Sequence, residues 1–212
     1  MYRISVVCSD VAHPVNAWLE RWRDRNSATA EITIVRDKAE LESGDFLFLI
    51  SCHQIIGADV RDNFRYVLVI HASDLPQGRG WSPMVWEVLN GAETITVSLV
   101  EAGDSVDSGD IWYKRSFALD GTELLDELNA RLFDIELELM DWAIANCDTI
   151  QPQSQTGEPT FWPRRTPADS EIDPHRPLAE SFDKIRVADR DRFPAFFTYR
   201  GATYTIRLEK QS

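Results

Sequence analysis

Four short apolar segments in the first 70 residues constrain the fold more than any other feature of the sequence. They are RISVV (3–7), EITIV (31–35), DFLFLIS (45–51) and YVLVI (66–70). Their β-branched and aliphatic composition is typical of buried strands. Stretches with helical spacing of apolar residues separate several of them. Strands that alternate with helices predict an α/β, Rossmann-like fold with a mostly parallel sheet and helices on both faces.

The segments that follow extend this pattern to about residue 150. Apolar spacing predicts helices over 37–43, 83–91 and 121–146, and alternation predicts strands over 93–101 and 110–119. The longest of these helices has one continuous apolar face, and its acidic residues lie opposite. We therefore expect a single main domain over residues 1–150.

The last sixty or so residues differ in composition from the main domain. A stretch rich in Gln, Pro and Thr leads into a helical pattern over 177–190 and a hairpin over 195–209, which turns at Arg200-Gly201. A segment of this size is small for an independent fold. We expect residues 151–212 to form a linker and a small C-terminal helix-and-hairpin appendage.

Charge and composition argue against several classes of partner. Residues 1–150 hold 26 acidic and 12 basic side chains, and residues 151–212 hold 9 acidic and 10 basic ones. Neither part has the cationic footprint of a nucleic-acid-binding protein. No apolar run is long enough to span a membrane, and Met1 leads directly into a strand-like segment without a signal-peptide pattern. We expect a cytoplasmic protein that binds no nucleic acid and no membrane.

The three cysteines do not form a metal-binding pattern. Cys8, Cys52 and Cys147 are far apart in the sequence. An odd number of isolated cysteines is typical of reduced thiols in a reducing compartment. We expect no metal.

The apolar strand over 66–70 runs directly into His71 and a loop rich in Gly and Pro. In open parallel sheets, ligands bind beyond the carboxyl ends of the strands. A histidine in this position would be held rigidly at that edge. The alternative is a histidine that only makes local hydrogen bonds, and that alternative fits His13, His53 and His175 better than His71.

A second loop, VEAGDSVDSGDI (100–111), strengthens the first interpretation. Asp107 is followed by Ser108 and Gly109, so the backbone can turn sharply and direct a carboxylate. A carboxylate beside an imidazole stabilises the charged ring and orients it. Alone, an Asp-Ser-Gly sequence is also an ordinary hairpin turn. Together, the two loops predict an acid–base pair of His71 and Asp107.

These two segments resemble the 10-formyltetrahydrofolate-dependent formyltransferases. That family carries Asn-x-His-x-Ser-x-Leu-Pro after a core strand, then a Gly and a Pro, and an Asp-x-Gly loop further on. The matching residues here are His71, Ser73, Leu75, Pro76, Gly80, Pro83, Asp107 and Gly109. The similarity covers about residues 45–118.

The C-terminal part resembles one branch of this family. TGEPTFWPRRTPADSEIDP (156–174) is similar to the segment that follows the catalytic domain in formyltransferases acting on nucleotide-linked amino sugars, and 182–201 is similar to their short tail. The tRNA-modifying branch has a larger, basic C-terminal domain. The resemblance therefore implies a formyltransferase domain over 1–150, a formyl donor in 10-formyltetrahydrofolate and a nucleotide-linked amino sugar as acceptor. The expected assembly is a monomer or a homodimer.

The resemblance also implies a role for individual residues. The acceptor amine attacks the formyl carbon, His71 stabilises the developing oxyanion, and Asp107 orients His71 and accepts the proton that the amine loses. Ser73 belongs to the substrate side, where it orients the loop rather than acting as a nucleophile. Arg79 and Trp81 lie on the acceptor side, although a surface cation and a packing aromatic are equally natural there.

The expected folate pocket has two walls. One contains Gln54 and Ile56, in the loop after the strand over 45–51. The other is the backbone of the loop that precedes Asp107, formed by Gly103, Asp104, Ser105 and Val106. Both walls follow from the family resemblance alone.

One position departs from the family pattern. The family asparagine two residues before the histidine is Val69 here. Loss of one oxyanion donor typically costs about 10²–10³ in rate. Another donor, such as Gln54 or His53, could replace it, or the oxyanion site could be weaker, or the protein could bind folate or a nucleotide with little turnover. A non-sugar amine also stays open as the acceptor.

Overall fold

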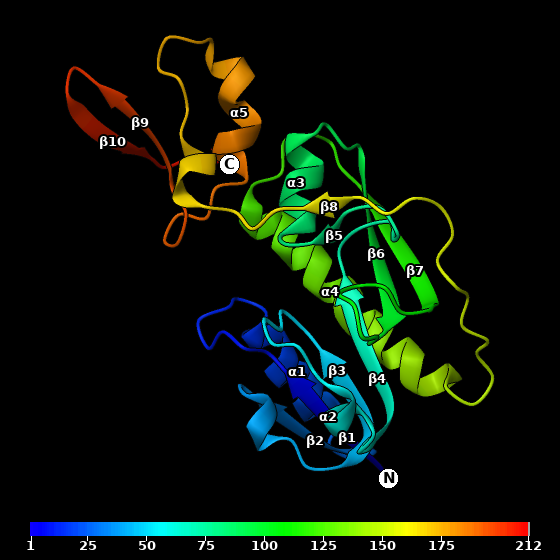
Figure 1. Ribbon diagram of the computed structural model, residues 1–212. Helices are drawn as coiled ribbons and strands as arrows, with labels where there is room; N and C mark the ends of the chain where they lie inside the picture. The colour runs from blue at the N-terminus through cyan, green and yellow to red at the C-terminus, as the bar shows by residue number, and fades with distance from the viewer. Residues whose placement is uncertain (212) are drawn as a thin grey trace.

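The computed structural model describes residues 1–211 and centres on a six-stranded sheet (Figure 1). The strand order is β2-β1-β3-β4-β6-β7. The strands are β1 (Tyr2–Val7), β2 (Ala30–Val35), β3 (Gly44–Leu49), β4 (Phe64–His71), β6 (Thr94–Glu101) and β7 (Ile111–Ala118). The first four pair in parallel, and β6 and β7 pair antiparallel. The predicted α/β fold with a mostly parallel sheet is confirmed.

The helices α1 (Asn16–Asn26), α3 (Pro83–Leu89) and α4 (Leu125–Asn146) contribute to one hydrophobic core. The main cluster joins residues of the sheet to these three helices. A smaller cluster contains strand residues that alternate with those of the main core. It is covered by loops and by α2 (Ala58–Arg61), a single helical turn. Among the described residues, the face of the sheet that carries this smaller cluster therefore has no helix longer than α2 in that cluster.

Two predicted helices differ from the structure. The segment over 37–43 forms only a 3₁₀ turn, η1 (Lys38–Glu40), because a capping box between Asp37 and Glu40 closes it on itself. The helix expected over 121–146 begins at Leu125. The residues before it form a tight turn, in which the buried Glu123 carboxylate accepts hydrogen bonds from the backbone N–H groups of Asp120 and Gly121.

Residues 151–163, which we call the strap, lie along the main domain instead of forming a free linker (Figure 1). Within the strap, β8 (Phe161–Trp162) pairs in parallel with β5 (Arg79–Gly80), a two-residue strand in the loop that follows His71. Sequence patterns did not predict either strand, because two residues carry no periodicity. The division of the chain near residue 150 stays a prediction.

The appendage follows the strap and contains a short helix and a hairpin. Its elements are η2 (Pro167–Ser170), α5 (Leu178–Arg186), β9 (Ala195–Tyr199) and β10 (Ala202–Ile206). The hairpin extends away from the central sheet (Figure 1). Its predicted turn at Arg200-Gly201 is confirmed, since both residues have a positive φ between two antiparallel strands. Among the helices described in residues 1–211, we find none with the length and apolarity needed to cross a membrane.

One buried acid in the main core gives a testable pH dependence. Glu136 of α4 is buried, and its Oε2 has no hydrogen-bond partner among the described residues. Burial raises the pKa of this carboxyl to about 8, from an ordinary value of 4.5. The folded protein therefore holds a proton that the unfolded chain releases. The stability from this proton is complete below about pH 4.5 and is lost as the pH rises through about 8.

We expect Glu136→Gln to remove this dependence, because glutamine has the same shape and never ionises. The unfolding free energy of the variant minus that of the wild type should therefore rise by on the order of 4 kcal/mol from pH 5 to pH 9. Urea unfolding at both pH values measures the difference. Glu138→Gln, an exposed position on the same helix, is the control and should follow the wild type. Parallel pH profiles for the wild type and Glu136→Gln would contradict the assignment.

Candidate active site

His71 is the last residue of β4 and lies at the carboxyl edge of the parallel strands. Its ring is buried, and its Nε2 is 2.8 Å from the carbonyl oxygen of Gly78. A carbonyl can only accept, so Nε2 carries a proton and donates it to Gly78. This leaves Nδ1 as the nitrogen that faces other groups.

Nδ1 of His71 faces Asp107, as the two loop motifs predict. The distance from Nδ1 to Oδ2 is 3.5 Å, and the two side chains are 8% and 7% exposed. The same Oδ2 accepts a hydrogen bond from the backbone N–H of Gly80 at 2.9 Å. Because Nε2 already holds a proton, the contact with Asp107 is attractive when Nδ1 is protonated as well. The geometry therefore places the Nδ1 edge of the imidazole directly against a buried carboxylate.

Two glycines allow the loops to approach closely enough for this contact. A Cβ at Gly109 would lie 1.9 Å from the Glu101 carbonyl oxygen, so only glycine lets the loop after Asp107 turn against β6. Gly80 has φ +102°, and a Cβ there would lie 2.6 Å from the Trp162 carbonyl oxygen. These two positions explain physically why glycine is needed at both places in the motif.

Ser73 orders the loop after β4. Its side chain is buried, and its hydroxyl donates to the carbonyl of Gln77 at 2.7 Å. Its own carbonyl accepts from the Ser98 hydroxyl of β6 at 2.7 Å. A direct contact between the Ser73 hydroxyl and an acceptor would require the bond to Gln77 to break.

The two expected walls of the folate pocket lie side by side, joined by a residue that sequence reasoning missed. The guanidinium of Arg61 donates to the carbonyls of Ile56 (2.9 Å) and Gly103 (3.1 Å) and forms an ion pair with Asp104. No motif marks Arg61. It lies in α2, which is too short to give a periodic pattern.

The side chains exposed on these walls are not all those that the family resemblance names. Ile56 is buried in the smaller core cluster, whereas its neighbour Ile55 is 73% exposed. In the facing loop, Val106 is 57% exposed. Ser105 is exposed too, and its carbonyl accepts from the Ser108 hydroxyl. Both walls thus present an apolar side chain together with backbone groups.

Gln54 and His53 are the two candidates to replace the family asparagine, which is Val69 here, as oxyanion donor. Val69 and His71 are two residues apart on β4 and so project on the same face. Both ends of the Gln54 amide are engaged, since Nε2 donates to Asp37 (2.8 Å) and Oε1 accepts from the Lys38 backbone (2.8 Å). His53 is exposed. Of the two candidates, His53 is the one with a freely accessible ring.

Trp81 marks the expected acceptor side. Trp81 is 37% exposed, and its ring lies close to two groups: the His53 ring, with centroids 5.4 Å apart, and the Arg164 guanidinium, 4.9 Å from the Trp81 centroid. Arg79 precedes it on β5, and its Nε is buried without a hydrogen-bond partner within residues 1–211. Arg164 belongs to the segment after the strap, so only the fold brings it to Trp81.

The strap supplies further contacts that sequence reasoning missed. The Thr160 hydroxyl accepts from the backbone N–H of Gly78 at 2.8 Å, and the Thr160 carbonyl accepts from that of Arg79 at 2.9 Å. Gln155 donates to the carbonyls of Asp107 (2.8 Å) and Gly109 (2.9 Å). The resemblance of 156–174 to a family segment covers Thr160 but assigned it no role, and it does not include Gln155.

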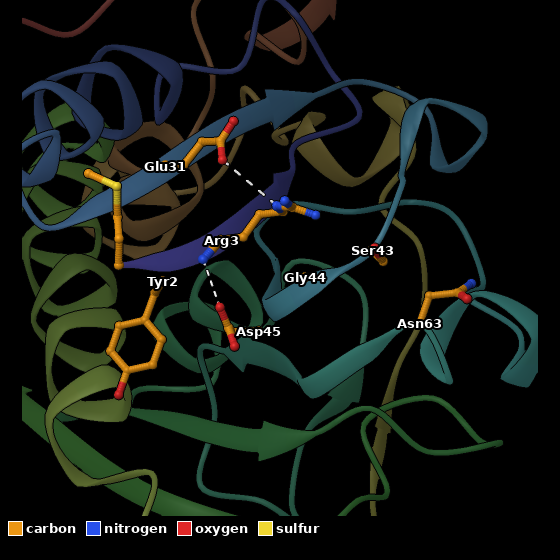
Figure 2. Close-up of a pocket in the computed structure, with 8 residues that line it drawn as sticks. Tyr2, Arg3, Glu31, Ser43, Gly44, Asp45 and Asn63 are labelled. Carbon is orange, nitrogen blue, oxygen red and sulfur yellow. Dashed lines mark hydrogen bonds and ion pairs between the residues drawn. The ribbon is translucent and has the colours of Figure 1, made fainter.

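Two cavities lie away from His71 and Asp107. A cavity of about 440 Å³ lies at the amino edge of the parallel strands, where Arg3 contacts Glu31 (3.7 Å) and Asp45 (2.8 Å) (Figure 2). A second, of about 280 Å³, lies between α4 and the appendage. Neither is lined by His71 or Asp107. Within the described residues, no group of three His, Cys, Asp or Glu side chains is arranged to hold a metal ion.

Comparison with known proteins gives one family. The model of the formyl transferase family matches residues 3–144. A methionyl-tRNA formyltransferase of Rickettsia massiliae (strain Mtu5) is 29% identical over 162 residues, which is 74% of this chain and 52% of that protein. The chain spans about half the length, or less, of the curated relatives it matches.

Solved structures share the fold. A methionyl-tRNA formyltransferase from Clostridium thermocellum has a TM-score of 0.84 and 26% identity, covering 100% of this chain and 94% of that one. A sugar N-formyltransferase from Shewanella sp. FDAARGOS_354 has a TM-score of 0.75 and 15% identity over 100% of this chain and 99% of that one. HypX from Aquifex aeolicus, in complex with tetrahydrofolic acid, has a TM-score of 0.77 and 18% identity, covering 95% of this chain and 36% of that one.

Proposed function

This chain belongs to the formyl transferase family, and we propose that it transfers a formyl group from 10-formyltetrahydrofolate to the amine of a nucleotide-linked amino sugar. The observation that carries the proposal is the contact between His71 and Asp107 at the carboxyl edge of the sheet. Parallel sheets bind ligands at this edge. An imidazolium and a carboxylate placed together there can stabilise negative charge and accept a proton in the same reaction.

Each residue of the pair has one task. The positive charge of His71 stabilises the formyl oxygen as negative charge develops on it during attack by the amine. Asp107 keeps the His71 ring charged and in place, and it accepts the proton that the amine loses, directly or through water. The formyl carbon would come from 10-formyltetrahydrofolate: as its new bond to the acceptor nitrogen forms, its bond to N10 breaks and tetrahydrofolate leaves. The proton that the amine loses balances the proton that N10 gains.

The two walls joined by Arg61 suit a folate. Ile55 and Val106 expose apolar side chains on facing segments, which is the surface that a flat pterin ring needs on its faces. Backbone groups of the loop over 103–106 lie at the same place and can pair with the polar edge of the ring. We propose that this loop, with the segment around Gln54 and Ile56, forms the folate side of the site.

The features around Trp81 suit a nucleotide. An exposed indole offers a stacking surface for a base, and the adjacent Arg164 offers a cation for phosphate. The buried, unpartnered Nε of Arg79 is a further donor close to the Asp107 loop. The net charge of −13 argues against a large polyanion such as tRNA, whose binding rests on many cationic contacts.

A methionyl-tRNA acceptor is the second candidate, because the curated relatives are methionyl-tRNA formyltransferases. A mass-spectrometric screen with 10-formyltetrahydrofolate separates the two. The panel contains nucleotide-linked amino sugars, the same sugars without the nucleotide, free amino acids and methionyl-tRNA. We expect a formyl mass gain on a nucleotide-linked sugar, with kcat/KM about 10²-fold or more above that of the free sugar, because remote binding energy is used at the reacting centre.

Other outcomes of this screen would change the assignment. Formylation of methionyl-tRNA alone would establish the second candidate. If a free amino sugar is formylated as well as its nucleotide-linked form, the Trp81 region has no role in recognising the acceptor. Tight folate binding without transfer to any amine would favour a binding protein in which Val69 has removed an essential donor.

A further inference from the structure

Gln155 links three segments of the candidate site that are distant in the sequence. Its Nε2 donates to the carbonyls of Asp107 and Gly109, and its Oε1 accepts from Nη2 of Arg79 at 2.6 Å. Arg79 is followed by Gly80, whose N–H donates to the Asp107 carboxylate. The contacts therefore form a closed ring of Gln155, Asp107, Gly80 and Arg79.

The orientation of the Gln155 amide is determined by its neighbours. Arg79 can only donate, so it must face the amide oxygen. The carbonyls of Asp107 and Gly109 can only accept, so they must face the amide nitrogen, whose two hydrogens satisfy both. No other neutral side chain of this length offers one acceptor and two donors in a fixed plane.

The loop that Gln155 holds is not relaxed on its own. Asp107 has φ +53°, a left-handed conformation that is unfavourable for a residue with a Cβ. Such a conformation persists only where its surroundings enforce it. On one side Asp107 is held by Gly80 through its carboxylate, and on the other by Gln155 through its backbone carbonyl.

We propose that Gln155 is a positioning residue for formyl transfer, which keeps the Asp107 carboxylate directed at His71 from the strap outside the family-matched region. This inference rests on the proposed function. Gln155 touches neither His71 nor the reacting atoms, and it acts through the Asp107 loop. The strap therefore supports the active site through Gln155 and is not only a connection to the appendage.

The first test is kinetic. For Gln155→Ala we expect kcat to fall about 10- to 100-fold with KM changed less than about threefold, because a small misplacement of a catalytic group has this effect. Gln153→Ala is the matched control: it is the same residue type in the same strap, it is exposed, and its side chain makes no hydrogen bond within residues 1–211. It should retain kcat within about twofold.

A second variant separates the two halves of the amide. Gln155→Glu keeps an acceptor for Arg79 and has the same shape, but it places an acceptor where the Asp107 and Gly109 carbonyls need a donor. We expect it to be no more active than Gln155→Ala. Wild-type kcat in Gln155→Glu would overturn the proposal, since the donation to the loop would then have no effect.

A third readout needs no activity, so it distinguishes failure of this inference from failure of the proposed function. The backbone amide of Gly80 donates to the Asp107 carboxylate, and its ¹H–¹⁵N resonance reports whether that carboxylate stays in place. We expect this resonance to move in both Gln155 variants and to stay unchanged in Gln153→Ala, with equal melting temperatures as the control for folding. An unchanged Gly80 resonance in the Gln155 variants would overturn the inference whether or not transfer is observed.

Discussion

His71→Ala is expected to lower kcat/KM of formyl transfer by about 10³-fold, because it removes the imidazole that lies beside Asp107 at the carboxyl edge and that we propose stabilises the oxyanion. His71→Gln is the sharper variant. A glutamine can still donate to the Gly78 carbonyl, but it carries no positive charge. We expect His71→Gln to lower kcat/KM by about 10²-fold or more. This variant separates the contribution of the positive charge from the contribution of loop order.

Steady-state kinetics with the acceptor found in the screen measures this effect. His175→Ala is the matched control, because that histidine is exposed in the appendage, and it should retain activity within about twofold. Circular dichroism and thermal unfolding check the fold, since removal of the ring leaves the Gly78 carbonyl without its partner. Near-normal turnover in a folded His71→Ala would remove His71 from the mechanism.

Asp107→Asn is expected to lower kcat by about 10²–10⁴-fold with little change in KM. The asparagine oxygen can still accept from the Gly80 N–H, so the loop keeps its main contact. The negative charge is lost, however, so the imidazolium of His71 is no longer stabilised and the amine proton has no base. The effect should therefore appear in the chemical step rather than in binding.

The control for Asp107→Asn lies in the same loop. Asp110→Asn changes the same group at a position whose side chain has no hydrogen bond or ion pair within the described part of the chain, and it should leave kcat within about twofold. A pre-steady-state measurement of the first turnover shows whether chemistry is the step that slows. If Asp107→Asn transfers formyl at the wild-type rate, the proton acceptor must be sought elsewhere.

The strands could be predicted because their signal is local. Runs such as YVLVI are apolar on both faces, and this is a property of consecutive residues in a buried parallel strand. The segment over 37–43 shows the limit of such reasoning. Its charges and spacing suit a helix, but a capping box closes it after one turn, so tertiary position and local side-chain contacts decided the outcome.

The contact between His71 and Asp107 was predictable for a related reason. His71 follows a core strand, and Asp107 lies in a Gly-containing loop after β6, the neighbour of β4 in the sheet. Once the strands pair in this order, both residues arrive at one edge. The acceptor side was predicted less completely, since the family resemblance placed Trp81 there but not its partners His53 and Arg164.

By itself, then, the sequence determined the α/β fold and the meeting of an imidazole with a carboxylate, because short-range composition and strand order suffice for both. Only the tertiary structure decided how that pair is supported. Arg61, Gln155 and Thr160 reach the site by hydrogen bonds across 42 to 82 positions of chain. Such contacts leave no local pattern, because they form only after packing of the whole chain offsets the entropy of closing long loops.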